Sequence, residues 1–265
     1  MFLVANWKMN MTRSLIDGYL DVLAGRPMSG ILERKRLSVA LAAPHIYLDY
    51  VNREVHRRKL PVQIVAQDVS TRTSGAFTGE VGVPNLLDIG IKGSLIGHSE
   101  RRRFFRETDE DVVAKTGLCL NGGVVPIICF GESRPDRENG VTLETLRSQL
   151  EPVCEEIVRA REEGIYTPFY LAYEPVWAIG SGVNAGLEDI QEVVTFVCEA
   201  FPWPDLPNCL YGGSVGLENI RELASSEFLS GFLVGSSWLD PNGLLNSAEL
   251  LPQTERTAQE GVRFK

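Results

Sequence analysis

The stretch Phe169-Tyr170-Leu171-Ala172-Tyr173-Glu174-Pro175-Val176-Trp177-Ala178-Ile179-Gly180 joins an apolar run of the strand type to a single carboxylate. Proline follows Glu174 at once and cannot continue a sheet ladder, so the strand should end at the carboxylate. An apolar patch, residues 176–179, and a glycine-rich turn come next. We interpret this pattern as a general base at a strand exit, beneath a movable hydrophobic lid that would exclude water and raise the pKa of Glu174 towards neutrality.

Seven further apolar runs are spread along the chain, at residues 2–5, 37–42, 62–66, 94–97, 124–129, 209–212 and 232–235. With 169–173 they make eight runs that are continuous rather than alternating, which is typical of parallel strands covered on both sides. Segments with helical spacing separate them, most clearly 142–163 and 187–201. Eight strand–helix units predict an α/β fold, a (β/α)8 barrel. An open doubly wound sheet is the competing architecture, but equal units without a break in composition favour closure.

The length of 265 residues and the apolar content of 44% suit one large domain. We expect a single barrel domain over residues 1–265, with a polar tail from about residue 252. No apolar run approaches the length that crosses a bilayer, and no N-terminal export signal is visible. Five cysteines without a CxxC pair indicate reduced thiols in a cytoplasmic protein.

The net charge of −9 argues against nucleic acid as a partner. Two basic runs, residues 56–59 and 101–103, are local. The first predicts a solvated helix face and the second predicts ion pairs within or between subunits. The three histidines show no metal-ligand spacing, so we expect no metal site.

Four other motifs follow predicted strands: Asn6-Trp7-Lys8-Met9-Asn10, Gly97-His98-Ser99-Glu100-Arg101-Arg102, Tyr211-Gly212-Gly213-Ser214 and Leu233-Val234-Gly235-Ser236. With the segment after Glu174, this set in this order resembles the triosephosphate isomerase family, from residue 2 to about residue 239. The resemblance implies a single-domain TIM barrel that needs no cofactor. It also implies a substrate class, a three-carbon sugar phosphate whose carbonyl moves between adjacent carbons.

Chemistry in such barrels takes place at the carboxyl ends of the strands, so residues scattered in the sequence should converge there. By resemblance, Glu174 is the base and His98 is the neutral electrophile, a pairing already established for that family. A short helix after His98 would hold the imidazole neutral. Lys8 would stabilise the negative charge that develops on the substrate, and its neighbours Trp7 and Met9 should lower the local dielectric.

Further roles are implied by the same resemblance. Asn6 would position Lys8 and bind the substrate, and Glu100 would pair with Lys8. The phosphate would lie on backbone N–H groups, where glycine permits close approach and where strand 8 leads into a short helix N-terminus. The phosphate-contacting positions are Gly180, Ser214, Gly235 and Ser236. Supporting positions are Ser99, Leu233 and Ile179, and structural support would come from Gln67, Asp68, Arg102, Cys129 and Glu132.

The loop at residues 75–80 resembles the one that this family inserts into a neighbouring subunit. It carries Phe77 and Thr78 at its tip, and an aromatic tip that packs on nothing of its own would be costly in a monomer. We therefore expect a homodimer. An ordinary surface loop is the alternative.

Some positions depart from the family pattern. Val183-Asn184 stands where a lysine is usual in the lid. Ser236 replaces a glycine, and a serine would be strained there if the position needs a positive φ. The leading hypothesis is interconversion of glyceraldehyde 3-phosphate and dihydroxyacetone phosphate. The alternatives are a longer ketose phosphate such as a tetrulose phosphate, a non-catalytic barrel with a binding role, and a phosphate-binding lyase, which the segment after Glu174 disfavours.

Overall fold

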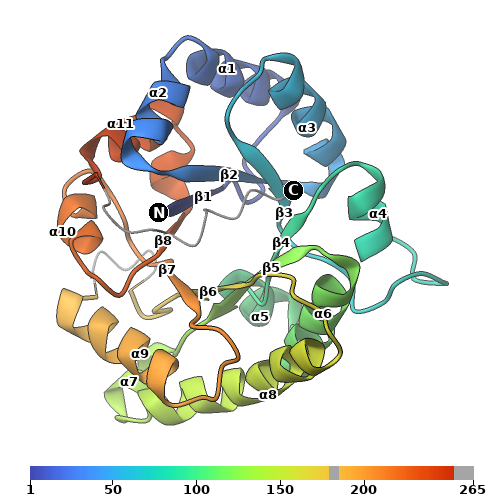
Figure 1. Ribbon diagram of the computed structural model, residues 1–265, viewed down its shortest axis with the longest axis vertical. Helices are drawn as coiled ribbons and strands as arrows, with labels where there is room; N and C mark the ends of the chain where they lie inside the picture. The colour runs from blue at the N-terminus through green and yellow to red at the C-terminus, as the bar shows by residue number, and fades with distance from the viewer. Residues whose placement is uncertain (179–184, 254–265) are drawn as a thin grey trace.

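The computed structural model describes residues 1–178 and 185–253. Eight parallel strands close into a barrel in the order of the chain, and the helices lie around its outside (Figure 1). The strands are β1 (Phe2–Asn6), β2 (Ser38–Ala43), β3 (Gln63–Ala66), β4 (Gly93–Ile96), β5 (Val125–Phe130), β6 (Tyr170–Tyr173), β7 (Asn208–Tyr211) and β8 (Gly231–Val234). The predicted (β/α)8 barrel is confirmed, and the open sheet is wrong because β1 also pairs with β8.

The connecting helices are α1 (Arg13–Ala24), α2 (Met28–Lys35), η1 (His45–Tyr47), α3 (Leu48–Arg57), α4 (Val83–Asp88), α5 (Ser99–Phe105), α6 (Asp109–Gly122), α7 (Arg134–Glu138), α8 (Thr142–Glu162), α9 (Leu187–Glu199), α10 (Ile220–Ala224), η2 (Ser236–Trp238) and α11 (Pro241–Leu250). Both long helices expected from the sequence are present as α8 and α9. The short helix expected after His98 is α5. The polar tail beyond residue 253 lies outside the described residues, so the domain boundary stays a prediction.

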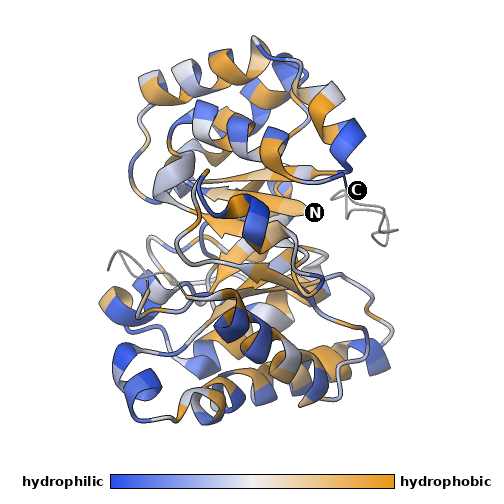
Figure 2. Ribbon diagram, turned by 90° about the vertical axis from the view of Figure 1, so that its left-hand side faces the viewer, coloured by the Kyte–Doolittle hydropathy of each residue, from blue (hydrophilic) through white to orange (hydrophobic). Residues whose placement is uncertain are grey.

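Each strand buries both of its faces, in two separate cores. In β1, Phe2 and Val4 point into the barrel, where they meet one or more residues from every other strand. Leu3 and Ala5 point outward into the larger core between strands and helices. Figure 2 shows apolar residues along the strands at the centre and a mixture of polar and apolar residues along the surrounding helices. This double burial is why the strand sequences read as continuous apolar runs.

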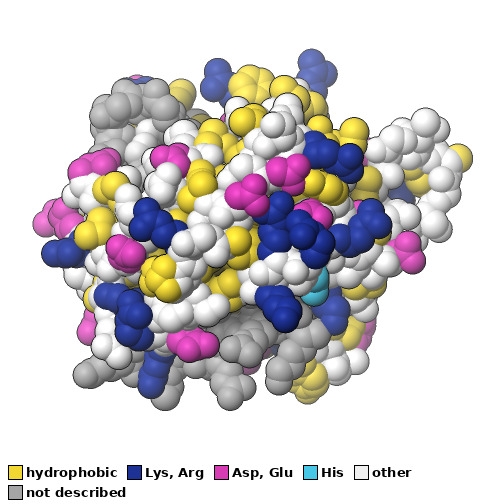
Figure 3. Space-filling view, turned by 90° about the horizontal axis from the view of Figure 1, so that it is seen from above, with side chains coloured by type: hydrophobic (Ala, Val, Ile, Leu, Met, Phe, Trp, Pro, Cys, Tyr) yellow, Lys and Arg dark blue, Asp and Glu magenta, His cyan; other side chains and the backbone are white. Residues whose placement is uncertain are grey.

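The two basic runs form ion pairs inside the chain. In the first run His56, Arg57 and Lys59 are exposed, as expected of a solvated face. Arg58 is the exception: its side chain is only 11% exposed, and it pairs with Asp17, Asp21 and Glu54. Arg102 pairs with Asp109. Figure 3, the view from above, shows basic side chains interspersed with acidic and apolar ones rather than a continuous basic surface.

In the part of the chain that the structure describes, no helix has both the length and the apolar character of a membrane span. Within the same residues, no cluster of histidine, cysteine and carboxylate side chains could hold a metal ion.

Candidate active site

Lys8 lies in a tight turn directly after β1. Its φ of 49° places it in the left-handed region, which costs energy in a residue other than glycine. The turn is held by Asn6, whose Oδ1 accepts the Lys8 N–H at 3.0 Å, and by Gln67, whose Nε2 donates to the Lys8 carbonyl at 2.9 Å. This arrangement directs the ammonium group to Glu100 Oε1, at 2.7 Å. Of its two neighbours, Trp7 is buried but Met9 is 96% exposed, so the expectation that Met9 lowers the local dielectric is wrong.

His98 stands at the exit of β4, as the N-cap residue of α5. The backbone N–H of Glu100 donates to its Nδ1 at 3.2 Å, so that nitrogen carries no proton in this arrangement. The proton then belongs on Nε2, which faces Glu174 Oε1 at 2.9 Å. The first turn of α5 therefore sets the tautomer of the imidazole.

Glu174 lies directly after β6 and is 2% exposed. Its backbone N–H donates to the Phe130 carbonyl at 2.8 Å, which continues the pairing of β5 and β6 by one residue. Of its two carboxylate oxygens, Oε1 meets His98 and Oε2 accepts the Ser99 N–H at 2.8 Å. The carboxylate is thus enclosed, with both oxygens hydrogen-bonded.

The contact between Glu174 and His98 shifts the pKa values of the two side chains in opposite directions. Burial by itself would raise the pKa of Glu174, but His98 and the Ser99 N–H lower it on balance. Burial would likewise lower the pKa of His98, and the neighbouring Glu174 carboxylate raises it on balance. The expectation that the pKa of Glu174 is raised is therefore wrong for this arrangement, because the imidazole partner outweighs desolvation.

A cavity of about 180 Å³ brings these groups together with the exits of β7 and β8. It is lined by Asn6, Lys8, His98, Glu174, Gly212, Gly213, Ser214, Val215, Glu218, Leu233, Val234, Gly235, Ser236 and Ser237. Eight of the predicted positions thus meet at one end of the barrel. Ser99 and Glu100 stand behind them, in contact with Glu174 and Lys8.

Two glycines leave room for the catalytic side chains beside them. A Cβ on Gly212 would lie 2.9 Å from Glu174 Cγ, and a Cβ on Gly235 would lie 2.9 Å from Lys8 Cε. Both distances are too short for carbon atoms in contact. The sequence interpretation did not select Gly212, although its place in the Tyr211-Gly212-Gly213-Ser214 motif is the signal that could have found it.

Ser236 does not have the strained backbone that its replacement of glycine suggested. Four residues other than glycine have a positive φ in the described chain, and Ser236 is not one of them. It begins η2, a three-residue 3-10 helix, so the helix N-terminus expected here is only a single turn.

Several predicted positions lie elsewhere or outside the described residues. Ile179 and Gly180, with the far part of the expected lid, fall outside them. Phe77 and Thr78 lie in an exposed loop away from the cavity. Phe77 is 45% exposed and is not without contacts, because the Arg72 guanidinium stacks on its ring at 5.5 Å.

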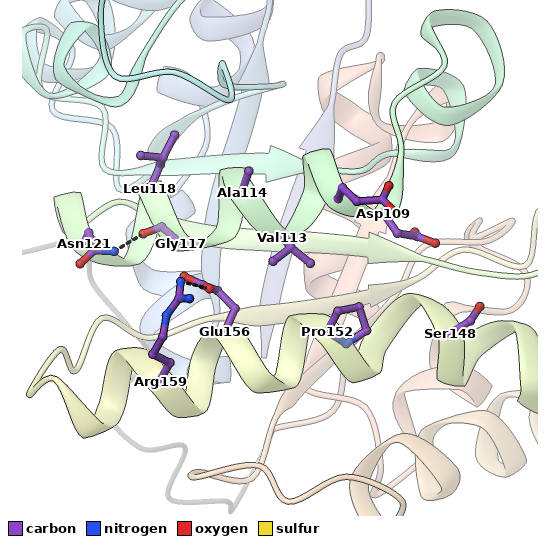
Figure 4. Close-up of a pocket in the computed structure, with 11 residues that line it drawn as sticks. Asp109, Val113, Ala114, Gly117, Leu118, Asn121, Ser148, Pro152, Glu156 and Arg159 are labelled. Atoms are coloured by element: carbon purple, nitrogen blue, oxygen red, sulfur yellow. Dashed lines mark hydrogen bonds and ion pairs between the residues drawn. The ribbon is translucent and has the colours of Figure 1, made fainter.

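A larger cavity of about 580 Å³ lies between α6 and α8 (Figure 4). Its walls include Val113, Leu118 and Pro152, and the carboxylate of Glu156 pairs with Arg159 at one side. It contains none of the predicted site residues. The smaller cavity at the strand ends is therefore the candidate active site.

The sequence interpretation missed two sets of charged residues. Glu218 lines the cavity, with no motif that would mark it. Behind Gly97, the buried Glu107 joins Lys115 at 2.9 Å and Arg101 at 2.5 Å. Glu107 also accepts the Gly97 N–H at 2.9 Å, so it holds the β4 exit that presents His98.

The sequence model of the family described as triosephosphate isomerase matches residues 1–250. The chain is 36% identical over 246 residues to the triosephosphate isomerase of Neurospora crassa, covering 91% of this chain and 94% of that protein. It is 35% identical over 253 residues to that of Rubrobacter xylanophilus, covering 93% and 95%. To that of Delftia acidovorans it is 37% identical over 241 residues, covering 89% and 93%.

Proposed function

Because the chain belongs to the triosephosphate isomerase family, we propose that Glu174, His98 and Lys8 carry out the family's reaction in the cavity at the strand ends. The protein is an isomerase that interconverts D-glyceraldehyde 3-phosphate and dihydroxyacetone phosphate, a step of glycolysis. One observation carries the assignment of roles. The side chains of Lys8, His98 and Glu174 come from three different strand ends and line the same small cavity.

The chemistry follows from the three groups. The Glu174 carboxylate removes a proton from carbon, and the electrons of that C–H bond form the double bond of an enediolate. The charge that appears on the former carbonyl oxygen is stabilised by the Nε2–H of His98 and by the ammonium of Lys8. The proton then returns to the adjacent carbon, while the hydroxyl proton on that carbon passes to the former carbonyl oxygen, so that the carbonyl group moves by one position.

Substrate binding would adjust both acid–base groups. In the structure Nε2 of His98 lies 2.9 Å from Glu174 Oε1. A bound substrate would place its oxygens between these two atoms, because the Nε2–H has to donate to the substrate carbonyl. When these oxygens separate the two groups, Glu174 loses the partner that lowers its pKa and becomes a stronger base. His98 loses the carboxylate that raises its pKa, while burial and the α5 N-terminus continue to favour the neutral form.

The phosphate would bind at the exits of β7 and β8. Ser214, Gly235 and Ser236 line that side of the cavity and offer backbone N–H groups and two hydroxyls. Lys8, whose ammonium group approaches Gly235, supplies the positive charge. We propose the same phosphate role for Gly180, on the resemblance alone. The alternative of a longer ketose phosphate was motivated by the altered phosphate loop, but Ser236 has no positive φ there and the matched relatives are triosephosphate isomerases.

A coupled assay tests the proposed function. The protein with D-glyceraldehyde 3-phosphate should form dihydroxyacetone phosphate, and Glu174→Gln should lower the turnover by about 10²–10⁴, as is usual for loss of a general base. An inactive parent protein would refute the function. A Glu174→Gln variant that keeps more than about a tenth of the activity would remove Glu174 from the role of base.

We also propose a homodimer. Large apolar side chains are exposed on the loops that follow the first three strands, where Met9 is 96%, Ile46 is 83% and Phe77 is 45% exposed. Hydrogen bonds join these loops, from Gln67 to the Lys8 carbonyl and between His45 and the Asp68 carbonyl. Large apolar side chains exposed on adjoining loops support a protein interface at this end of the barrel. Light scattering should give twice the chain mass, and Phe77→Glu should give the monomer; a monomeric parent would refute the dimer.

A cytoplasmic location is the last part of the proposal. It is supported by five free cysteines, four of which are buried. Fractionation of the source cells tests it, and recovery of the protein outside the cytoplasm would contradict it.

A further inference from the structure

Arg137 of α7 contacts both the chain that follows β6 and the first turn of α9. On one side its guanidinium stacks on the ring of Trp177, with 5.2 Å between Cζ and the ring centre. On the other side it pairs with Asp189 in the first turn of α9. The other carboxylate oxygen of Asp189 accepts the N–H of Gly186, at 3.1 Å, where α9 begins. A single side chain thus bridges the chain that leaves Glu174 and the chain that enters α9.

Arg137 also faces Glu132, a carboxylate with no exposed surface. Glu132 Oε1 accepts hydrogen bonds from Trp177 Nε1 at 2.7 Å and from Tyr173 Oη at 3.1 Å. Its Oε2 is buried and has no hydrogen-bond partner among the described residues. Arg137, 3.8 Å from Oε1, is the cation that the structure places beside this carboxylate. Burying a charge is costly unless it is compensated, so Arg137 stabilises the anionic Glu132 that holds Trp177.

The helix that carries Arg137 is short but well fixed. Ser133 caps α7, and its N–H donates to Asp136 Oδ2 at 2.8 Å. Arg134, one turn earlier on the same helix, donates to the Trp177 carbonyl at 3.2 Å. Both arginines of α7 therefore reach the same residue, which lies three positions after Glu174. No sequence motif had marked either arginine for a function.

We propose that Arg137 is a positioning residue of the isomerase, which fixes the backbone after Glu174 relative to α9 and so holds the catalytic carboxylate in place. The inference rests on the proposed role of Glu174 as the base. The backbone connection is short, because the Val176 N–H donates to the Glu132 carbonyl at 3.1 Å and Trp177 follows directly. Arg137 itself does not line the catalytic cavity. Its loss should therefore affect proton transfer more than substrate binding.

The test compares Arg137→Gln, Asp189→Asn and the double variant in the coupled assay. We expect each single variant to lower kcat by about 10–10² because a misplaced base reacts slowly, with KM changed by less than about threefold. The double variant should lose little more than Arg137→Gln, since both changes break one bridge. Arg137→Lys should recover part of the loss, because lysine keeps the positive charge but lacks the planar guanidinium group that stacks on Trp177.

Arg161→Gln is the matched control. Arg161 pairs with Asp205 at 3.0 Å and joins the end of α8 to the segment before β7, away from the catalytic cavity. Loss of the Arg161 ion pair should lower the melting temperature and leave kcat unchanged, which is what the loss of a purely structural contact does. Tryptophan fluorescence gives a second readout. Emission should shift in Arg137→Gln, because Trp177 loses its cation, and stay constant in Arg161→Gln.

An active parent whose kcat is unchanged in Arg137→Gln would overturn the inference and leave the proposed function standing. Equal kcat losses in Arg137→Gln and Arg161→Gln would also overturn it. If Arg137→Gln does not fold, Arg137→Lys and Asp189→Asn decide, and full activity in both overturns it. An inactive parent would refute the proposed function and this inference together.

Discussion

Gly212→Ala should impair catalysis through the added methyl group alone. Gly212 lies directly after β7, and its N–H donates to the Tyr173 carbonyl at 2.7 Å, so its backbone is held against β6. A Cβ at this position would stand 2.9 Å from Glu174 Cγ and 3.2 Å from the Tyr173 carbonyl oxygen. Carbon atoms in contact are about 3.5–4.0 Å apart, so the Glu174 side chain must move by roughly 0.6–1.1 Å.

A shift of that size is large for a general base. Misplacement by about 1 Å can cost about 10² in rate, so we expect kcat to fall by about 10–10². The overpacked site should also lose about 1–3 kcal/mol of unfolding free energy. KM should change less, because the protein groups that we propose to bind the substrate phosphate are not displaced. The coupled assay at saturating substrate measures kcat, and urea unfolding measures the stability.

Gly18→Ala is the control for this prediction. Gly18 lies inside α1, and a Cβ there has no heavy atom within 4 Å. Alanine is the better helix former by about 1 kcal/mol, so this variant should be slightly more stable and fully active. The reasoning is refuted if Gly212→Ala keeps a kcat within about twofold of the parent, since the Cβ would then fit without moving the base.

Three other predictions test the surroundings of the site. Lys8→Met should lower kcat/KM by about 10²–10³, and inorganic phosphate should protect it much less than the parent against thermal unfolding; equal protection would place Lys8 away from the anion. Ser236→Gly should change kcat/KM for the triose phosphate by less than about tenfold, or about 1.4 kcal/mol, because Ser236 is unstrained; faster turnover of a tetrulose phosphate than of the triose by the native protein would contradict the substrate assignment. Lys115 and Arg101 outweigh burial and lower the pKa of Glu107, so its stabilisation is present above the unfolded pKa and is lost as the pH falls through the folded value. Glu107→Gln should therefore cost about 3–5 kcal/mol at neutral pH, with a difference from the parent that shrinks in acid; a constant difference in urea unfolding across that range would refute the role of its charge.

The strands could be predicted because their signal is local. In a closed parallel barrel both faces of a strand are buried, so runs such as residues 124–129 are apolar throughout and stand out from the helical segments. The turn after each run is also local, as Pro175 shows. The same reasoning located Lys8, His98 and Glu174, because polar residues at strand exits belong to one end of a barrel.

The charge state of the base could not be predicted in this way. The sequence placed Glu174 before an apolar segment and predicted a raised pKa, whereas the structure brings His98 within 2.9 Å and lowers it. Those two residues follow β4 and β6 and are far apart in the sequence, whereas electrostatic interactions depend on distance in space. Arg58 is a similar case, since three carboxylates from α1 and α3 surround a side chain that the sequence suggested was solvated.

The sequence by itself therefore determined the architecture, the strand exits and the set of side chains that meet there, because local burial and the parallel order of the strands fix them. Only the tertiary structure decided which atoms face one another. It showed that Gly212 must lack a side chain beside Glu174, that Ser236 is unstrained, and that Arg137 bridges Trp177 and Asp189. Each of these depends on contacts across different strands and helices, at separations that no spacing along the chain encodes.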